Sequence, residues 1–262
     1  MKIGMSSSCR YPLLTELAFE ELGKNRVDAA EIFFNASCEL EPPFVAKLKD
    51  IQKRYGINLV SIHPTMSLSE SFMFFSSYER RYAEGLDSYR RYAEILCEMG
   101  GKYIIMHGGK PNKVLDNEGY FERFGILAEE MRRCGATLLQ ENVVKFRAGD
   151  IDVLKSMSEY LGDSAAFCLD IKQSIRGGYS PFDAVDVLGD KIKHIHISDN
   201  TPERDCMLPL KGSFDFESFF KKVLDAGFKG DAIVEVYSDC YGESEELFES
   251  YKNIREKFLK FR

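Results

Sequence analysis

The feature that most constrains the fold of this chain is a regular alternation of two kinds of segment. Short runs of apolar and β-branched residues alternate with longer amphipathic runs from one end to the other. This alternation is typical of βα units around a parallel sheet. Eight short runs predict strands, over residues 2–5, 29–34, 58–62, 103–106, 137–140, 165–169, 192–197 and 232–236.

The longer runs predict eight helices, several of which have recognisable ends. Pro42 and Pro43 can start the second helix, because proline is tolerated in a first turn, and Gly23 can stop the first. Eight strands in strict alternation with eight helices favour a closed barrel over an open sheet. The length of 262 residues also matches one such barrel. We therefore expect an α/β protein with a single (β/α)8 TIM barrel domain spanning residues 1–262.

Composition narrows the classes of partner. The formal charge of −7 argues against a protein that binds nucleic acid through phosphate contacts, which usually need a basic stripe. Seven cysteines, an odd number without a C-x-x-C pair, are expected to be reduced thiols. The N-terminal residues lack a signal-peptide apolar region, and no run is long enough to span a membrane. We expect a cytoplasmic protein that acts on a small molecule; whether it is a homo-oligomer stays open.

Four polar residues follow four consecutive predicted strands. They are Glu141, Asp170, His196 and Glu235, at the ends of strands five to eight. Active sites of TIM barrels are built at the carboxyl ends of the strands, so these side chains should converge. Three carboxylates would repel one another there unless a cation relieved the repulsion. The set suits one divalent ion of the manganese, magnesium, cobalt or zinc kind.

The seventh strand carries two histidines on one face. Side chains in a strand point alternately to opposite sides, so His194 and His196 point the same way, with His196 nearer the end. We expect His196 to be the metal ligand at the rim. His194 is expected to fill an interior layer of the barrel beneath it.

A series of motifs in chain order resembles the xylose-isomerase-like barrels, a group that includes tagatose 3-epimerase, inosose dehydratase and endonuclease IV. The motifs are His63-Pro64, His107-Gly108-Gly109, Glu141-Asn142, Asp170, His196-x-x-Asp199 and Glu235-Val236-Tyr237. The resemblance covers nearly the whole chain. It implies that Glu141, Asp170, His196 and Glu235 bind one metal and that Glu141 and Glu235 also move protons.

Further residues are candidates for substrate contact. His63 and His107 follow strands three and four, and would bind substrate hydroxyls or hold a second metal. Lys172 should point toward the mouth by alternation from Asp170. Where many relatives have a histidine three residues after the strand-six aspartate, this chain has Gln173, which can bind a sugar hydroxyl. Arg204, in the long loop after strand seven, could reach a substrate carboxylate or phosphate.

These residues favour a metal-dependent isomerase or epimerase of a sugar or sugar derivative. The two glutamates would transfer protons through an enediolate that the metal holds. A keto-inositol dehydratase or lyase of the same fold is the alternative, because it would use the same intermediate. An endonuclease IV-like phosphodiesterase acting on abasic sites is disfavoured, since the histidine replaced by Gln173 and a histidine in the strand-seven loop are missing. A sugar sensor without activity is a third alternative.

Overall fold

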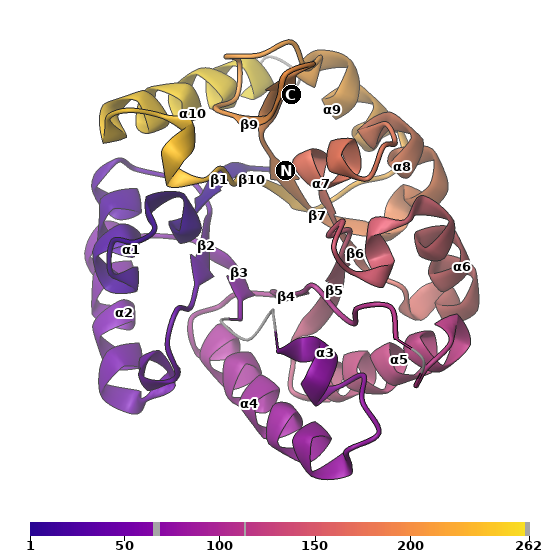
Figure 1. The fold of residues 1–262 in the computed structure, drawn as a ribbon. Coiled ribbons are helices and arrows are strands. Elements are labelled where there is room, and N and C mark those ends of the chain that lie inside the picture. The colour runs from indigo at the N-terminus through magenta and orange to yellow at the C-terminus, as the bar shows by residue number, and fades with distance from the viewer. Residues whose placement is uncertain (65–68, 113, 260–262) are drawn as a thin grey trace.

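The computed structural model describes residues 1–64, 69–112 and 114–259. Eight parallel strands close into a barrel in the spatial order β1-β10-β7-β6-β5-β4-β3-β2, with helices around the outside (Figure 1). The barrel strands are β1 (Ile3–Ser6), β2 (Ala30–Phe33), β3 (Leu59–His63), β4 (Tyr103–Met106), β5 (Thr137–Glu141), β6 (Phe167–Asp170), β7 (Ile192–Ile197) and β10 (Asp231–Val234). Each predicted strand corresponds to one of these, and the predicted (β/α)8 barrel is confirmed.

Helices follow the barrel strands as expected from the alternation. They are α1 (Thr15–Lys24), α2 (Pro42–Tyr55), α3 (Glu70–Met73), α4 (Glu79–Glu98), α5 (Asn117–Arg133), α6 (Ile151–Leu161), α7 (Ile171–Arg176), α8 (Pro181–Leu188), α9 (Phe216–Asp225) and α10 (Ser244–Leu259). The predicted stop at Gly23 is wrong, because α1 continues to Lys24. A Cβ at Gly23 would lie 2.7 Å from the Cβ of Tyr55, so this glycine allows α1 to pack closely on α2.

Two features of the loops were not predicted from the sequence. The long loop after β7 contains an antiparallel hairpin made of β8 (Asp199–Thr201) and β9 (Arg204–Met207). The short helix α7 begins immediately after β6, where no helix was predicted. Both lie at the carboxyl ends of the strands, where loop structure decides what surrounds the mouth of the barrel.

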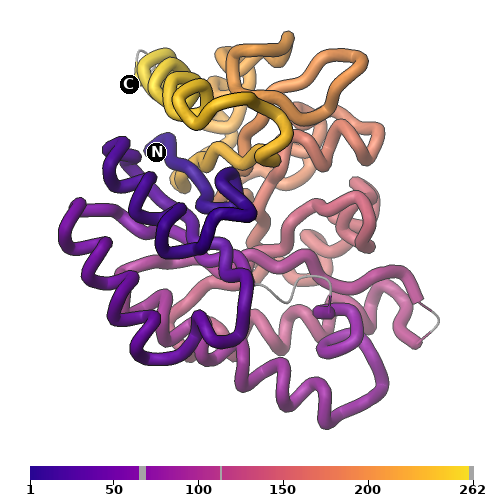
Figure 2. Tube along the Cα trace, turned by 60° about the vertical axis from the view of Figure 1, so that its left-hand side comes forward, coloured from indigo at the N-terminus to yellow at the C-terminus, as the bar shows by residue number. Residues whose placement is uncertain are grey.

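The two ends of the chain meet where the barrel closes. Strand β1 pairs with β10, with Ile3 opposite Ala232 and Met5 opposite Val234. Helix α10 covers this junction, and Figure 2 shows it beside the N-terminal strand. The hydroxyl of Tyr251 on α10 donates to the carbonyl oxygen of Ile3 at 3.3 Å. The last helix therefore helps to close the barrel.

The inward-pointing side chains of the barrel form layers. Alternation along the strands gives a rim layer and, two residues earlier on each strand, a second layer below it. The rim contains His63, His107, Glu141, Asp170, His196 and Glu235, and the layer below contains Glu31, Ser61, Ile105, Leu139, Cys168, His194 and Ile233. The apolar core lies mainly between the strands and the helices, where Ile195 and Ile197 point. The barrel interior is therefore unusually polar near its carboxyl end.

All seven cysteines are free thiols in the structure. Within residues 1–64, 69–112 and 114–259, no helix combines the length and the hydrophobicity that crossing a membrane would need.

Gly4 on β1 is a position where the barrel wall leaves no room for a side chain. A Cβ there would lie 2.2 Å from the carbonyl oxygen of Ala29, which accepts a hydrogen bond from Met5, and 2.5 Å from Cδ1 of Ile233. Relief requires movement of the backbone, so Gly4→Ala should lower the free energy of unfolding by about 3 kcal/mol. Chemical denaturation with an unchanged m-value would measure this loss.

Gly125→Ala is the matched control. Gly125 lies within α5, and a Cβ there would meet only Cδ2 of Leu161, at 3.1 Å. Because alanine favours a helix more than glycine does, this variant should keep or slightly raise the stability. Equal stability of the Gly4 variant and the wild type would contradict the steric explanation.

Candidate metal centre

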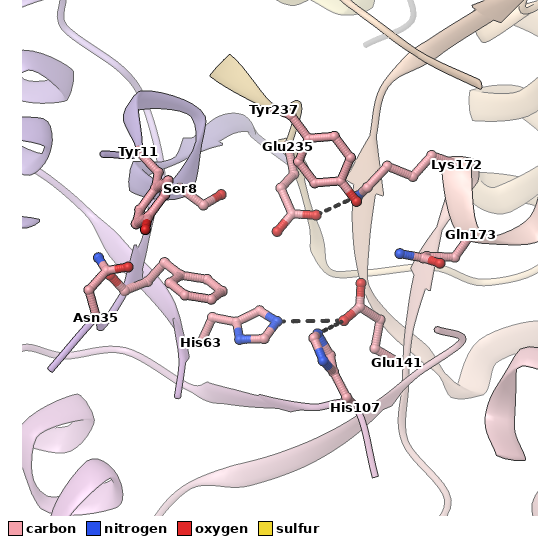
Figure 3. Close-up of a pocket in the computed structure, with 11 residues that line it drawn as sticks. Ser8, Tyr11, Asn35, His63, His107, Glu141, Lys172, Gln173, Glu235 and Tyr237 are labelled. Atoms are coloured by element: carbon pink, nitrogen blue, oxygen red, sulfur yellow. Dashed lines mark hydrogen bonds and ion pairs between the residues drawn. The ribbon is translucent and has the colours of Figure 1, made fainter. Parts of the chain in front are cut away.

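A cavity of about 330 Å³ lies at the carboxyl end of the barrel (Figure 3). Glu141, Lys172, Gln173 and Glu235 line one side, and Ser8, Tyr11 and Asn35 line the side across from them. Phe33, His63, His107 and Tyr237 complete the lining. The cavity therefore has a charged wall from the end of β5, the start of α7 and the residue after β10, and a more neutral wall from the segments that follow β1 and β2.

Four side chains converge on one point at the floor of the cavity, those of Glu141, Asp170, His196 and Glu235. Nδ1 of His196 lies 3.2 Å from Oε1 of Glu141, 3.4 Å from Oε2 of Glu235 and 3.9 Å from Oδ2 of Asp170. One donor atom from each of the four lies within 4.8 Å of the other three. Strand register produces this convergence, since His196 is paired with Asp170 on one side and with Ile233, two residues before Glu235, on the other.

The sequence after β6 orients the carboxylate of Asp170. Asp170 is the N-cap of α7, and its Oδ1 accepts a hydrogen bond from the backbone N–H of Gln173 at 3.0 Å. Capping satisfies a donor at the helix start and fixes the carboxylate. Oδ2 is therefore left to face the cavity, where Lys172 donates to it.

Lys172 lies among the carboxylates rather than in solvent. Its Nζ donates to Oδ2 of Asp170 and, at 2.7 Å, to Oε2 of Glu235, and the side chain is 2% exposed. Burial alone would lower the pKa of Lys172, but the charges of Asp170 and Glu235 outweigh it and raise this pKa well above its ordinary value. Burial likewise opposes the ionisation of Glu235, but Lys172 and then His196 hold the pKa of Glu235 below its ordinary value.

The pKa of Asp170 moves in the opposite direction, to about 6. Burial is the main cause, and it outweighs the nearby charge of Lys172; the negative charges of Glu141 and Glu235 add to the rise. The close contact with Lys172 nevertheless requires Asp170 to act as the acceptor. The cluster thus holds its carboxylates under strong mutual repulsion, which positive charge must offset.

Two rim histidines hold Glu141 in place. Nε2 of His107 lies 3.1 Å from Oε2 of Glu141, and Nε2 of His63 lies 3.5 Å from the same oxygen (Figure 3). Burial raises the pKa of Glu141, but the interactions with His107, His196 and His63 outweigh it and hold this pKa well below its ordinary value. Glu141 is therefore an ionised carboxylate with a fixed orientation, able to bind a cation or accept a proton.

A buried carboxylate below the rim was missed by the sequence analysis. Oε2 of Glu31 on β2 lies 3.2 Å from Nε2 of His196 and 3.4 Å from Nε2 of His194, and it accepts a hydrogen bond from Ser61 at 2.8 Å. Because Nε2 of His196 lies next to Glu31, Nδ1 of the same imidazole ring faces the carboxylate cluster above. The available signal was a single glutamate within an otherwise apolar predicted strand.

The structure places most of the predicted substrate-contact residues at the cavity. His63, His107, Lys172 and Gln173 line it, whereas Arg204 is exposed on the hairpin and its guanidinium donates to the carbonyl oxygen of Asp239 at 3.4 Å. His194 is fully buried in the second layer, as expected, although its neighbours there are polar. Ser8, Tyr11, Asn35 and Tyr237 were missed; each follows a strand end, and polar residues at those places were the available signal.

The four converging residues fit a divalent ion. Donor atoms around one such ion lie about 3 to 4 Å apart, given bond lengths of about 2.1 Å, and the spacings around His196 are of this size. Three carboxylates and one imidazole supply hard oxygen donors with one nitrogen, a set that accepts several divalent metals. Lys172 contacts two of the same oxygens, so its ammonium opposes such an ion.

The chain is similar to several known proteins in sequence and in fold. Fructoselysine 3-epimerase of Shigella flexneri is 23% identical over 252 residues, covering 90% of this chain and 90% of that protein. The structure of a D-tagatose 3-epimerase-like protein matches with a TM-score of 0.79 and 19% identity, covering 100% of this chain and 98% of that one. The IolI protein, whose crystal structure contains a zinc atom, matches with a TM-score of 0.78 and 16% identity, covering 97% and 96%.

A family model described as xylose isomerase-like TIM barrel matches residues 19–257. The match runs from the first helix to the last and includes every residue of the converging cluster and its histidine neighbours. The structure agrees with this assignment, because its closed barrel of eight parallel strands carries the cluster at the carboxyl ends. The chain belongs to the xylose isomerase-like TIM barrel family.

Proposed function

We propose that this protein is a metal-dependent epimerase or isomerase of a sugar or sugar derivative. The observation that carries the proposal is the convergence of Glu141, Asp170, His196 and Glu235 at the floor of a cavity large enough for a small carbohydrate. The names of relatives support it, since one is a fructoselysine 3-epimerase and another a D-tagatose 3-epimerase-like protein.

Glu141, Asp170, His196 and Glu235 would hold one divalent ion. When bound, it would polarise a substrate carbonyl and stabilise the negative charge of an enediolate. Manganese, magnesium, cobalt and zinc all suit the donor set. The zinc atom in the IolI structure supports a transition metal in a barrel of this kind.

Glu141 and Glu235 have the properties that proton transfer requires. They point into the cavity from strands β5 and β10, and the pKa of each is held below its ordinary value, so each is a carboxylate that can accept a proton. Epimerisation next to a carbonyl needs one group to remove the proton from one face and another to return a proton to the opposite face. His63 and His107 keep Glu141 oriented for its part.

The charge of the cavity favours an uncharged substrate. Among the described residues that line it, Lys172 is the sole lysine or arginine, and two carboxylates already bind it. Nearby Arg176 is held by Asp205 at 2.6 Å and by the hydroxyl of Tyr237 at 2.8 Å. In this arrangement of the side chains, no lysine or arginine among the described lining residues is free to bind a phosphate group, whereas Ser8, Asn35 and Gln173 suit sugar hydroxyls.

The first prediction from this proposal concerns metal binding. Protein dialysed against Mn²⁺ and then against metal-free buffer should retain about one ion per chain, because four donors converge on one point. Asp170→Asn should abolish retention, whereas Asp163→Asn, at an exposed position in the 3-10 helix of residues Gly162–Ser164, should not. Elemental analysis gives the stoichiometry. Absence of any ion in the wild type would contradict the metal centre.

The second prediction concerns the reaction. The metal-loaded protein, screened in deuterated water against ketoses, inososes and keto-glycosides, should incorporate deuterium next to the carbonyl of at least one of them. Glu141→Gln and Glu235→Gln should each reduce epimerisation at least about 100-fold, since each removes a proton-transferring group. Glu203→Gln, at an exposed turn, is the control and should keep wild-type activity.

The products of the same screen distinguish the rival reactions. Deuterium incorporation followed by loss of water from an inosose would identify the dehydratase. Cleavage of abasic duplex DNA would replace the proposal by the nuclease. Normal epimerisation by Glu235→Gln would remove Glu235 from the mechanism.

The third prediction concerns Glu31, a positioning residue below the metal ligands. Glu31→Gln should weaken Mn²⁺ binding by about 10- to 100-fold, because the carboxylate fixes which nitrogen of His196 faces the site. Ser61→Ala removes a hydroxyl from the same network but leaves Glu31 beside both histidines, so it should change the affinity only slightly. Titration calorimetry measures both. Equal affinities of the Glu31 variant and the wild type would contradict this role.

A further inference from the structure

The Lys172 ammonium contacts the same two oxygens that would bind the metal. Oδ2 of Asp170 and Oε2 of Glu235 accept hydrogen bonds from Nζ, and they are also the oxygens of these residues that face Nδ1 of His196, at 3.9 and 3.4 Å. Oδ1 of Asp170 is already used to cap α7. The ammonium and a divalent ion would thus share the same donor atoms.

The surroundings make such sharing unfavourable. Lys172 is 2% exposed and Asp170 is 1% exposed, so little water separates charges at this point. Repulsion between a divalent ion and an ammonium in van der Waals proximity is strong where water is excluded. An ion bound by Asp170 and Glu235 would therefore push the ammonium away from at least one of them.

The structure also offers the ammonium another position. Lys172 lines the cavity, and its Nζ lies 5.7 Å from the centre of the Tyr237 ring (Figure 3). The lysine side chain has four rotatable bonds, so Nζ can move toward this ring and the cavity while α7 stays in place. There it would face the substrate space, and the aromatic ring would partly replace the lost carboxylate contacts.

We propose that Lys172 is a resident counter-ion that exchanges with the metal. Without a metal, its ammonium neutralises Asp170 and Glu235 and holds the two carboxylates together. With a metal bound, it turns into the cavity beside Tyr237, where it can donate hydrogen bonds to a substrate oxygen. This inference rests on the metal centre of the proposed function and adds a role that is particular to the side chain at position 172.

The first test is the affinity for Mn²⁺ measured by titration calorimetry on the metal-free protein. Lys172→Met removes the competing charge, so its dissociation constant should be at least about tenfold lower than that of the wild type. Lys172→Gln, which keeps a hydrogen-bond donor without the charge, should change in the same direction. Lys145→Met, at an exposed position in the loop after β5, is the matched control and should bind like the wild type.

Thermal unfolding provides a second measurement on the same proteins. Without metal, Lys172→Met should unfold at a lower temperature than the wild type, because Asp170 and Glu235 lose their ammonium partner. With saturating Mn²⁺, this difference should disappear. An equal or weaker Mn²⁺ affinity of both Lys172 variants would overturn the exchange while leaving the metal centre intact.

A third measurement uses the wild type alone and does not depend on the folding of any variant. Limited acetylation followed by peptide mass spectrometry should modify Lys172 several-fold more in the presence of Mn²⁺ than in its absence. Modification of Lys145 should be the same in both. Unchanged acetylation of Lys172 in protein that has bound Mn²⁺ would overturn the exchange. Absence of Mn²⁺ binding in the wild type and in both variants would overturn the metal centre, and the exchange with it.

Discussion

Three carboxylates that enter one barrel mouth must be balanced by positive charge, and much of the local structure depends on this requirement. Glu141, Asp170 and Glu235 all point inward at the ends of β5, β6 and β10. In this structure the balance comes from Lys172 and from His196, whose pKa is raised well above its ordinary value: burial lowers it, but Cys168, Glu235 and Glu31 outweigh that effect. A divalent ion at the same place would also supply positive charge, so the cluster can be balanced in two ways.

The barrel assembles this cluster from segments far apart in the chain. Because side chains two residues apart on a strand point the same way, each rim residue has a partner in the layer below. His196 connects the two layers, with Nδ1 toward the carboxylates and Nε2 toward Glu31. The polar second layer of the barrel interior thus helps to fix the orientation of His196 in the rim layer. A change at β2 can consequently alter a site to which β2 contributes no ligand.

The fold and the four converging residues could be predicted from the sequence, because both depend on local patterns. These residues are Glu141, Asp170, His196 and Glu235. Strand ends are recognisable, and the barrel topology brings them together. Lys172 was placed correctly but for the wrong reason: strand alternation was assumed, whereas Lys172 lies in α7, which Asp170 caps. Glu31 could not be assigned, because its role depends on the pairing of β2 with β3, which brings Ser61 beside it, and on contacts across the barrel. The hairpin that carries Arg204 away from the cavity likewise depends on tertiary packing.

An internal cation would separate folding from metal binding in this barrel. Small proteins that fold around a metal lose their structure without it, because nothing else balances or connects the ligands. Here the barrel closes through strand pairing and the apolar layer under the helices, neither of which involves the cluster. Lys172, His63 and His107 meanwhile hold Asp170, Glu235 and Glu141 in place. The proposed ligands are therefore already in position, and an ion bound there would add chemistry to a site that the polypeptide has built.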